Sequence, residues 1–126
     1  MIIFDLSSAQ SEILVASDTS TYHCPEWSPT GERIGVAVYR VDYSHAALAL
    51  IDFTGAVQLV PTGAAYSNAL KWSPDASWIA FQCTEYAGTP DDPAFYQNME
   101  ICIVRPDGSG LRKLTQNDHF DAHPSW

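Results

Sequence analysis

One phrase occurs twice in full, as Cys24-Pro25-Glu26-Trp27-Ser28-Pro29-Thr30-Gly31 and as Ala69-Leu70-Lys71-Trp72-Ser73-Pro74-Asp75-Ala76, and begins a third time in His123-Pro124-Ser125-Trp126. Its three tryptophans stand 45 and 54 residues apart. A repeat of this length is typical of proteins built from successive small structural units. The repeat therefore decides the fold.

Around the phrase, each unit divides into four short strands. The first strand ends at the tryptophan, and a Ser-Pro turn follows because proline presets φ at the second turn position. The second strand is expected in residues 33–38 and 78–82, where apolar residues alternate. The third strand is expected in residues 2–8, 48–55 and 101–108, and the fourth ends at the repeated Leu14, Leu59 and Leu114.

Two positions conflict with the repeat. Ala76 occupies the slot that Gly31 fills in the first copy, so we expect a strained or differently shaped turn there. Residues 44–50 have good helix propensity when considered alone. They align with the β-branched run of residues 101–104, and this alignment favours a strand.

Composition supports an all-β chain and excludes several functions. The 126 residues suffice for one domain, and 46% of them are apolar. The 15 acidic and 6 basic residues give a net charge of −9, which disfavours nucleic acid and anionic membrane surfaces. No stretch is long and apolar enough for a membrane helix. The acidity fits solvated turns first, and a basic partner is the second interpretation.

Four-stranded units with a tryptophan phrase are typical of propeller blades. The phrase followed by Ile79-Ala80-Phe81, together with the later Asp107-Gly108 and Leu114-Thr115, resembles the blade repeat of TolB-type propellers. The same blade type occurs in the propeller domain of prolyl-oligopeptidase-like serine peptidases. The repeat departs from the family pattern at single positions, which weakens individual turns. These positions are Thr30, Thr54, Leu70 and Ala76.

The resemblance implies a partial β-propeller with just under three four-stranded blades of a six-bladed ring. We expect eleven strands in one domain, with blade repeats at residues 1–22 (partial), 23–66, 67–120 and 121–126 (partial). An open arc leaves sheet faces and strand edges exposed. We therefore expect self-association, or remaining blades elsewhere in a longer protein.

The resemblance also assigns loops to faces. The loops 60–68 and 115–122, which enter inner strands, share a face with the loops 39–46 and 84–99 that join second and third strands. The last of these carries an eight-residue insertion with prolines and aromatic rings, which suit contact with a protein or peptide. The alternative is a loop that only covers its own blade. The candidate partner-binding residues are Tyr86, Asp91, Asp92, Phe95, Tyr96, His119, Asp121 and His123.

Several titratable side chains could bind a metal or have a structural role. His119, Asp121 and His123 alternate along an extended segment, yet polar structural contacts are favoured over a metal. The resemblance implies that Asp121 bonds the backbone of the neighbouring loop. Asp91 and Asp92 match no calcium-loop spacing with their neighbouring acids, so solvated charges are expected. We expect no metal, cofactor or catalytic residue.

We expect the paired cysteine positions and the repeated tryptophans to lie in the interior. Cys83 and Cys102 flank the insertion on adjacent strands, where a disulfide is conceivable and buried free thiols are the default. The repeat predicts that its three tryptophans are equivalent core residues between blades, namely Trp27, Trp72 and Trp126.

The sequence therefore favours a non-enzymatic, TolB-like propeller segment that binds protein or peptide partners through the channel-mouth face, with no nucleic acid and no membrane insertion. The resemblance implies partners in the cell envelope. The alternative is the gating propeller of a serine peptidase whose catalytic domain lies outside this chain.

Overall fold

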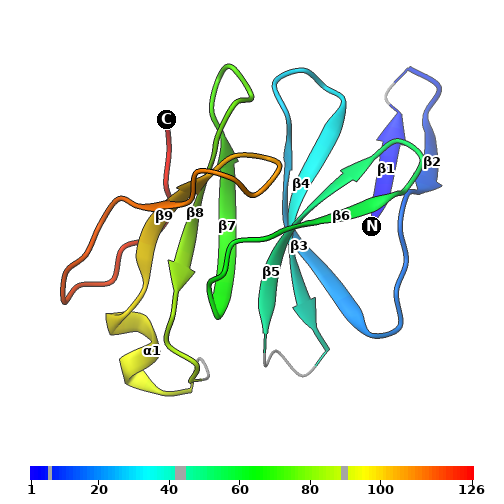
Figure 1. Ribbon diagram of the computed structural model, residues 1–126. Coiled ribbons are helices and arrows are strands. Elements are labelled where there is room, and N and C mark those ends of the chain that lie inside the picture. The colour runs from blue at the N-terminus through cyan, green and yellow to red at the C-terminus, as the bar shows by residue number, and fades with distance from the viewer. Residues whose placement is uncertain (6, 42–44, 89–90) are drawn as a thin grey trace.

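The computed structural model describes residues 1–5, 7–41, 45–88 and 91–126 (Figure 1). Residues 42–44 and 89–90, in the expected loops 39–46 and 84–99, lie outside the described part. Two four-stranded antiparallel units follow an N-terminal hairpin. The hairpin is β1 (Ile2–Asp5) and β2 (Gln10–Ile13). The first blade is β3 (Ser20–Trp27), β4 (Arg33–Arg40), β5 (Ala46–Asp52) and β6 (Val57–Val60), and the second blade is β7 (Tyr66–Trp72), β8 (Ile79–Thr84), β9 (Glu100–Val104) and β10 (Arg112–Lys113).

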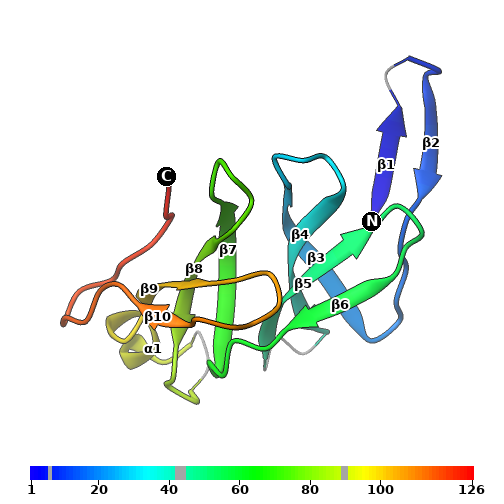
Figure 2. The same cartoon turned by 45° about the horizontal axis from the view of Figure 1, so that its top comes forward.

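The strand assignments derived from the repeat are confirmed in both blades. Residues 46–50, for which a helix competed, form most of β5, and Leu48 pairs with Ala37 of β4. One parallel pair joins the two blades. It links Ala46, the first residue of β5, with Tyr66, the first residue of β7. Figure 2 shows the two blades side by side with the hairpin beyond the first.

The inner strands β3 and β7 carry the same distortion. Their pairing shifts register between His23 and Glu26 and between Asn68 and Lys71. The residue three positions before each repeated tryptophan has a left-handed backbone, with φ of 51° at Cys24, 49° at Ala69 and 53° at His123. Non-glycine residues seldom adopt this conformation. Its recurrence in three units shows that the bulge belongs to the repeat.

The expected burial of the three tryptophans is correct only for Trp72. Trp72 is 8% exposed, whereas Trp27 and Trp126 are 49% and 55% exposed. The indole N–H of Trp72 donates to the carbonyl of Glu26 at 3.2 Å, and that of Trp126 donates to the carbonyl of Lys71 at 3.1 Å. Trp72 and Trp126 therefore make the same contact with the preceding unit. Only Trp72 also has a complete blade on both sides to cover it.

The eleventh expected strand is absent from the described residues. Residues 123–126, which follow the entry loop 115–122, were expected to lie in an inner strand but have no strand assignment. A strand requires a hydrogen-bonded neighbour, and the second strand of that unit is not within residues 1–126. The described residues thus form ten strands.

The Ser-Pro turns repeat their geometry despite the difference at position 76. Ala76 has φ of 57° where Gly31 has φ of 72°, and both donate their N–H to the serine carbonyl three residues earlier. The turn keeps its shape, and Ala76 bears the left-handed strain that the sequence predicted. In this turn Asp75 accepts hydrogen bonds from the hydroxyl of Ser73 at 2.6 Å and of Ser77 at 2.7 Å. These bonds lower the pKa of Asp75 to about 2, from 3.8.

Replacing Asp75 with asparagine is expected to destabilise the chain at neutral pH but not in acid. The folded-state pKa is depressed, so the carboxylate stabilises the fold above about pH 4 and loses this effect as pH falls toward about 2. Thermal melts of Asp75→Asn and the parent between these limits test this expectation. The control is Asp18→Asn in the exposed segment before β3. A melting difference that does not shrink in acid would contradict the assigned role.

Candidate interaction site

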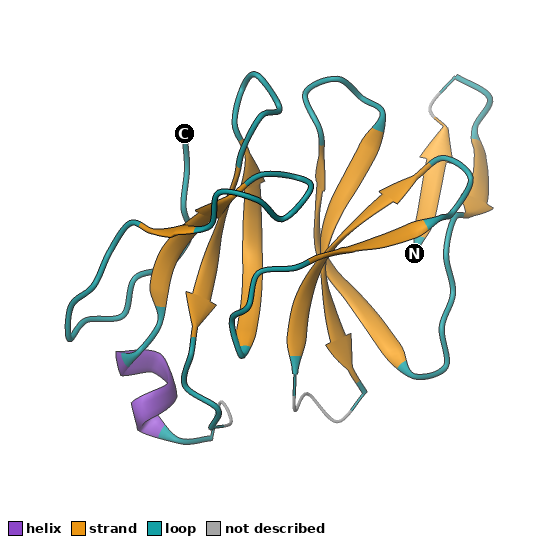
Figure 3. Ribbon diagram, in the orientation of Figure 1, coloured by secondary structure: helices purple, strands orange, loops and turns teal. Residues whose placement is uncertain are grey.

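The insertion in the second blade folds as a helix rather than as a simple loop. The helix α1 (Pro93–Gln97) lies beside the end of β8 and the start of β9, at the end of the blades opposite the β3–β4 and β7–β8 turns (Figure 3). Asp92 caps it by accepting from the N–H of Ala94 at 2.9 Å, and Pro93 occupies the first turn, where its missing N–H costs nothing. We call the surface formed by residues 84–88, 91–99 and 115–121 the loop end.

Tyr86 and Asp92, two of the predicted partner-binding residues, contact each other within the chain. The Tyr86 hydroxyl donates a short hydrogen bond to the Asp92 carboxylate. This bond lowers the pKa of Asp92 and raises the pKa of Tyr86. Both residues fix the start of α1. Asp91 is exposed.

Phe95 was also predicted to contact a partner, but it is 2% exposed and belongs to the core. Its ring lies 4.9 Å from that of Tyr66, which contacts Tyr39 at 5.6 Å. At its other side, Phe95 contacts Tyr96 at 5.5 Å, and Tyr96 contacts Phe120 at 5.5 Å. This edge-to-face row anchors the insertion across both blades. Through Phe95, the insertion therefore packs on both blades.

The outer end of the aromatic row faces solvent. Tyr96 is 45% exposed and Phe120 is 51% exposed. The sequence interpretation included Tyr96 in the site but omitted Phe120, although Phe120 stands between two proposed residues, His119 and Asp121. A ring flanked by polar residues in a loop was the available signal.

Glu100, a residue that is 5% exposed, holds the loop that carries Phe120 through hydrogen bonds. Glu100 accepts from the Thr115 hydroxyl at 2.5 Å and from the Asn117 N–H at 2.9 Å. Asp121 accepts from the side-chain amide of Asn117 at 2.7 Å, and its own N–H donates to the carbonyl of Met99 at 3.1 Å. The Asn117 bond lowers the pKa of Asp121. The Asp121 carboxylate thus bonds within its own loop, and the bond to the neighbouring loop is made by the Asp121 N–H, not by its side chain.

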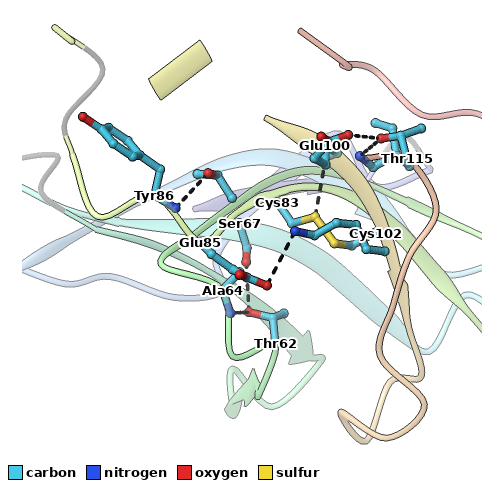
Figure 4. Close-up of a disulfide and its surroundings, with 12 residues drawn as sticks. Thr62, Ala64, Ser67, Cys83, Glu85, Tyr86, Glu100, Cys102 and Thr115 are labelled. Carbon is cyan, nitrogen blue, oxygen red and sulfur yellow. Dashed lines mark hydrogen bonds and ion pairs between the residues drawn. A yellow bond between two sulfur atoms is a disulfide. The ribbon is translucent and has the colours of Figure 1, made fainter. Parts of the chain in front are cut away.

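Cys83 and Cys102 form a disulfide, so the default expectation of free thiols was wrong (Figure 4). Cys83 lies on β8 opposite Glu100, and Cys102 lies on β9 opposite Phe81. The bond therefore crosses diagonally between neighbouring strands at the base of the insertion. It closes a loop of sequence separation 19 that contains α1.

Removal of this disulfide by the double substitution Cys83→Ala and Cys102→Ala is expected to lower the free energy of unfolding by about 3 kcal/mol, because the unfolded chain regains the entropy of an open loop. Urea unfolding of the variant and the parent measures the difference. Cys24→Ala, which alters the exposed free cysteine, is the matched control. Equal midpoints for the double variant and the parent would contradict a stabilising role.

Two concave regions accompany these elements. The loop-end pocket, of about 440 Å³, lies between the insertion and the loop 115–118. Its lining includes Glu85, Asn98, Glu100, Lys113, Asn117 and Asp118. The inner-strand groove, of about 430 Å³, lies beside the left-handed bulges of Cys24, Ala69 and His123. His123 therefore lies in the groove, apart from the loop-end residues with which it was grouped.

The described residues do not gather the acids and histidines into a metal site. No group of three or more His, Cys, Asp or Glu side chains in this part of the chain is placed to hold a metal ion. Among the acidic residues in and beside the insertion, Asp92 caps α1, Glu85 pairs with Lys113 at 3.6 Å, and Glu100 accepts from the Asn117 N–H. No helix in the described part has the length and apolar character needed to cross a membrane.

The whole chain is similar in sequence to proteins that are already known. A curated Tol-Pal system protein TolB from Anaeromyxobacter dehalogenans is 31% identical over 128 aligned positions, which cover 100% of this chain and 26% of that protein. TolB from Anaeromyxobacter sp. strain K matches with the same identity and coverage. No protein-family model matches the chain. The chain thus spans about a quarter of the length of these relatives.

Solved structures share the fold. TolB from Acinetobacter baumannii superposes with a TM-score of 0.66 at 19% identity, covering 95% of this chain and 27% of that one. A structure assigned as TolB from Agrobacterium tumefaciens gives a TM-score of 0.64 at 24% identity, covering 87% and 36%. A prolyl endopeptidase gives 0.60 at 20% identity, covering 87% and 18%. The chain is a partial β-propeller of the all-β class, and its blades resemble those of TolB.

Proposed function

We propose that this TolB-like propeller segment is a non-enzymatic module that binds a protein partner through its loop end. The observation that carries the proposal is the exposed ring pair Tyr96 and Phe120, which two separate segments bring together on a packed support. Aromatic rings held rigid before binding offer contact area at little entropic cost. The Tol-Pal name of the curated relatives is in keeping with a role in a protein assembly.

The proposed site contains fewer residues than the sequence predicted. Tyr96, Asp91 and His119 are exposed and available to a partner, and Phe120 joins them. Tyr86, Asp92 and Phe95 act by holding α1. Asp121 positions the loop that carries Phe120, and His123 belongs to the inner-strand groove.

Affinity capture with charge-introducing variants tests this proposal. The immobilised parent chain should retain a partner from an extract of the source cells. Gln97→Arg and His119→Arg, both at exposed loop-end positions, should each weaken retention about ten-fold or more by placing unpaired charge in the interface. The matched control is Glu32→Arg, at an exposed position in the β3–β4 turn of the opposite end. If Glu32→Arg abolished retention of the partner while Gln97→Arg and His119→Arg left it unchanged, binding through the loop end would be contradicted.

A second candidate is the propeller domain of a serine peptidase, favoured by the likeness to a prolyl endopeptidase. The gene sequence on either side of this segment separates the two. A G-x-S-x-G nucleophile motif in a strand–turn–helix context would support the peptidase. Further blades without such a module would support the binding protein.

A further inference from the structure

We propose that the loop end recognises a basic peptide segment, whose Lys or Arg side chain enters the loop-end pocket while a flanking apolar residue lies on Tyr96 and Phe120. This inference rests on the proposed function and specifies the chemistry of the partner. The partner segment belongs to a protein, because the site offers both an apolar surface and an adjacent polar pocket.

The apolar half of the site is the exposed ring pair. The Tyr96 and Phe120 rings meet edge to face at 5.5 Å, and about half of each residue is exposed. Phe95 supports Tyr96 from the core, and the Asp121 N–H bond to Met99 holds the segment that carries Phe120. The ring pair is therefore a fixed surface, which favours an apolar or proline side chain of the partner.

The polar half of the proposed site is the loop-end pocket. Asn98, two residues after Tyr96, lines the pocket together with Asn117 and Asp118, which precede Phe120. Its carboxylates are those of Glu85, Glu100 and Asp118, against the single ammonium group of Lys113. Glu85 and Glu100 already have partners within the chain, whereas the exposed Asp118 lies at the loop surface.

Charge complementarity selects the occupant. Residues 84–100 and 115–121 contain six acidic residues and neither lysine nor arginine. The whole chain has a net charge of −9. An acidic segment would be repelled from this surface, whereas a basic segment is attracted to it.

Titration of the isotope-labelled chain with a capped pentapeptide that contains two lysines separated by one proline tests the inference by NMR. Amide shifts are expected at Tyr96, Asn98, Asn117, Asp118 and Phe120. Raising NaCl from about 50 mM to about 500 mM should weaken binding about five-fold or more. A matched peptide with norleucine in place of both lysines should bind about ten-fold more weakly, since it lacks the charge.

Variants assign the two halves of the site. Tyr96→Ser and Phe120→Ser should each weaken binding about five-fold or more through lost ring contact, and Asp118→Asn should reduce the salt dependence. Phe53→Ser is the matched control, because Phe53 is 59% exposed in the first blade, away from the loop end. Equal binding of both peptides, shifts confined to residues elsewhere, or no effect of the loop-end variants would overturn the inference.

Different results would contradict basic-peptide recognition and the proposed binding function. A partner captured by the parent and lost with Gln97→Arg, but unaffected by Asp118→Asn and by salt, would refute basic recognition and leave binding through the loop end in place. Peptide binding with the expected salt dependence, but no retained partner, would support the recognition chemistry and count against the proposed function.

Discussion

Replacing Trp72 with alanine is expected to lower the free energy of unfolding by about 3–5 kcal/mol, because it removes a buried indole from the interface between two blades. Trp72 is 8% exposed and donates its indole N–H to the Glu26 carbonyl of the preceding blade. It also approaches Gly35, where an added Cβ would lie 3.1 Å from the indole nitrogen. Much of the packing between the blades therefore depends on this side chain.

Trp126 provides the matched control within the same chain. It makes the equivalent bond to the Lys71 carbonyl but is 55% exposed. Trp126→Ala should therefore cost about 1 kcal/mol, the value of one hydrogen bond with little burial. Urea unfolding followed by circular dichroism measures both variants. Equal losses for Trp72→Ala and Trp126→Ala would contradict the difference in packing.

Replacing Phe95 with alanine is also expected to lower the free energy of unfolding by about 3–5 kcal/mol, because it leaves a cavity where α1 packs on the blades. Phe95 is 2% exposed and links Tyr66 of β7 to Tyr96 of α1. For the same reason, trimming residues 84–99 to the length of the shorter loop 39–46 should destabilise the fold. Shortening a loop is by itself inexpensive, so the loss of stability would arise from the removal of Phe95 and not from the change in loop length.

The neighbouring Tyr96→Ala, at a 45% exposed position, should change the free energy of unfolding by about 1 kcal/mol or less. If Phe95→Ala prevents folding, Phe95→Leu should still unfold cooperatively with an intermediate loss. Hydrogen exchange of the α1 amides would report whether the insertion opens first. A stability for Phe95→Ala equal to that of Tyr96→Ala would contradict the anchoring role.

The repeat made the strands predictable because each unit confirms the others. Residues 46–50 show this best, since their local helix propensity gave way to alignment with β9, and they form β5. The turn at Ala76 was also predictable, because the glycine at the equivalent position indicated a left-handed backbone. Repetition thus supplied information that local propensity lacks.

The insertion was less predictable because no other unit contains its counterpart. The Asp92-Pro93 pair is a helix start signal, but a five-residue helix is too short to show apolar periodicity. Equivalence in the repeat also misled where surroundings differ. Trp27 and Trp126 match Trp72 in sequence, yet only Trp72 is covered on both sides. The Cys83–Cys102 bond depended on a diagonal approach across two strands that spacing alone does not reveal.

We propose above all that the loop end is the binding surface. Hydrogen–deuterium exchange of the chain, alone and saturated with its captured partner, measures this directly. The expected result is protection of residues 84–88, 91–99 and 115–121, with the β3–β4 and β7–β8 turns unchanged. Protection confined to those turns or to the inner-strand groove, with the loop end unaffected, would contradict it.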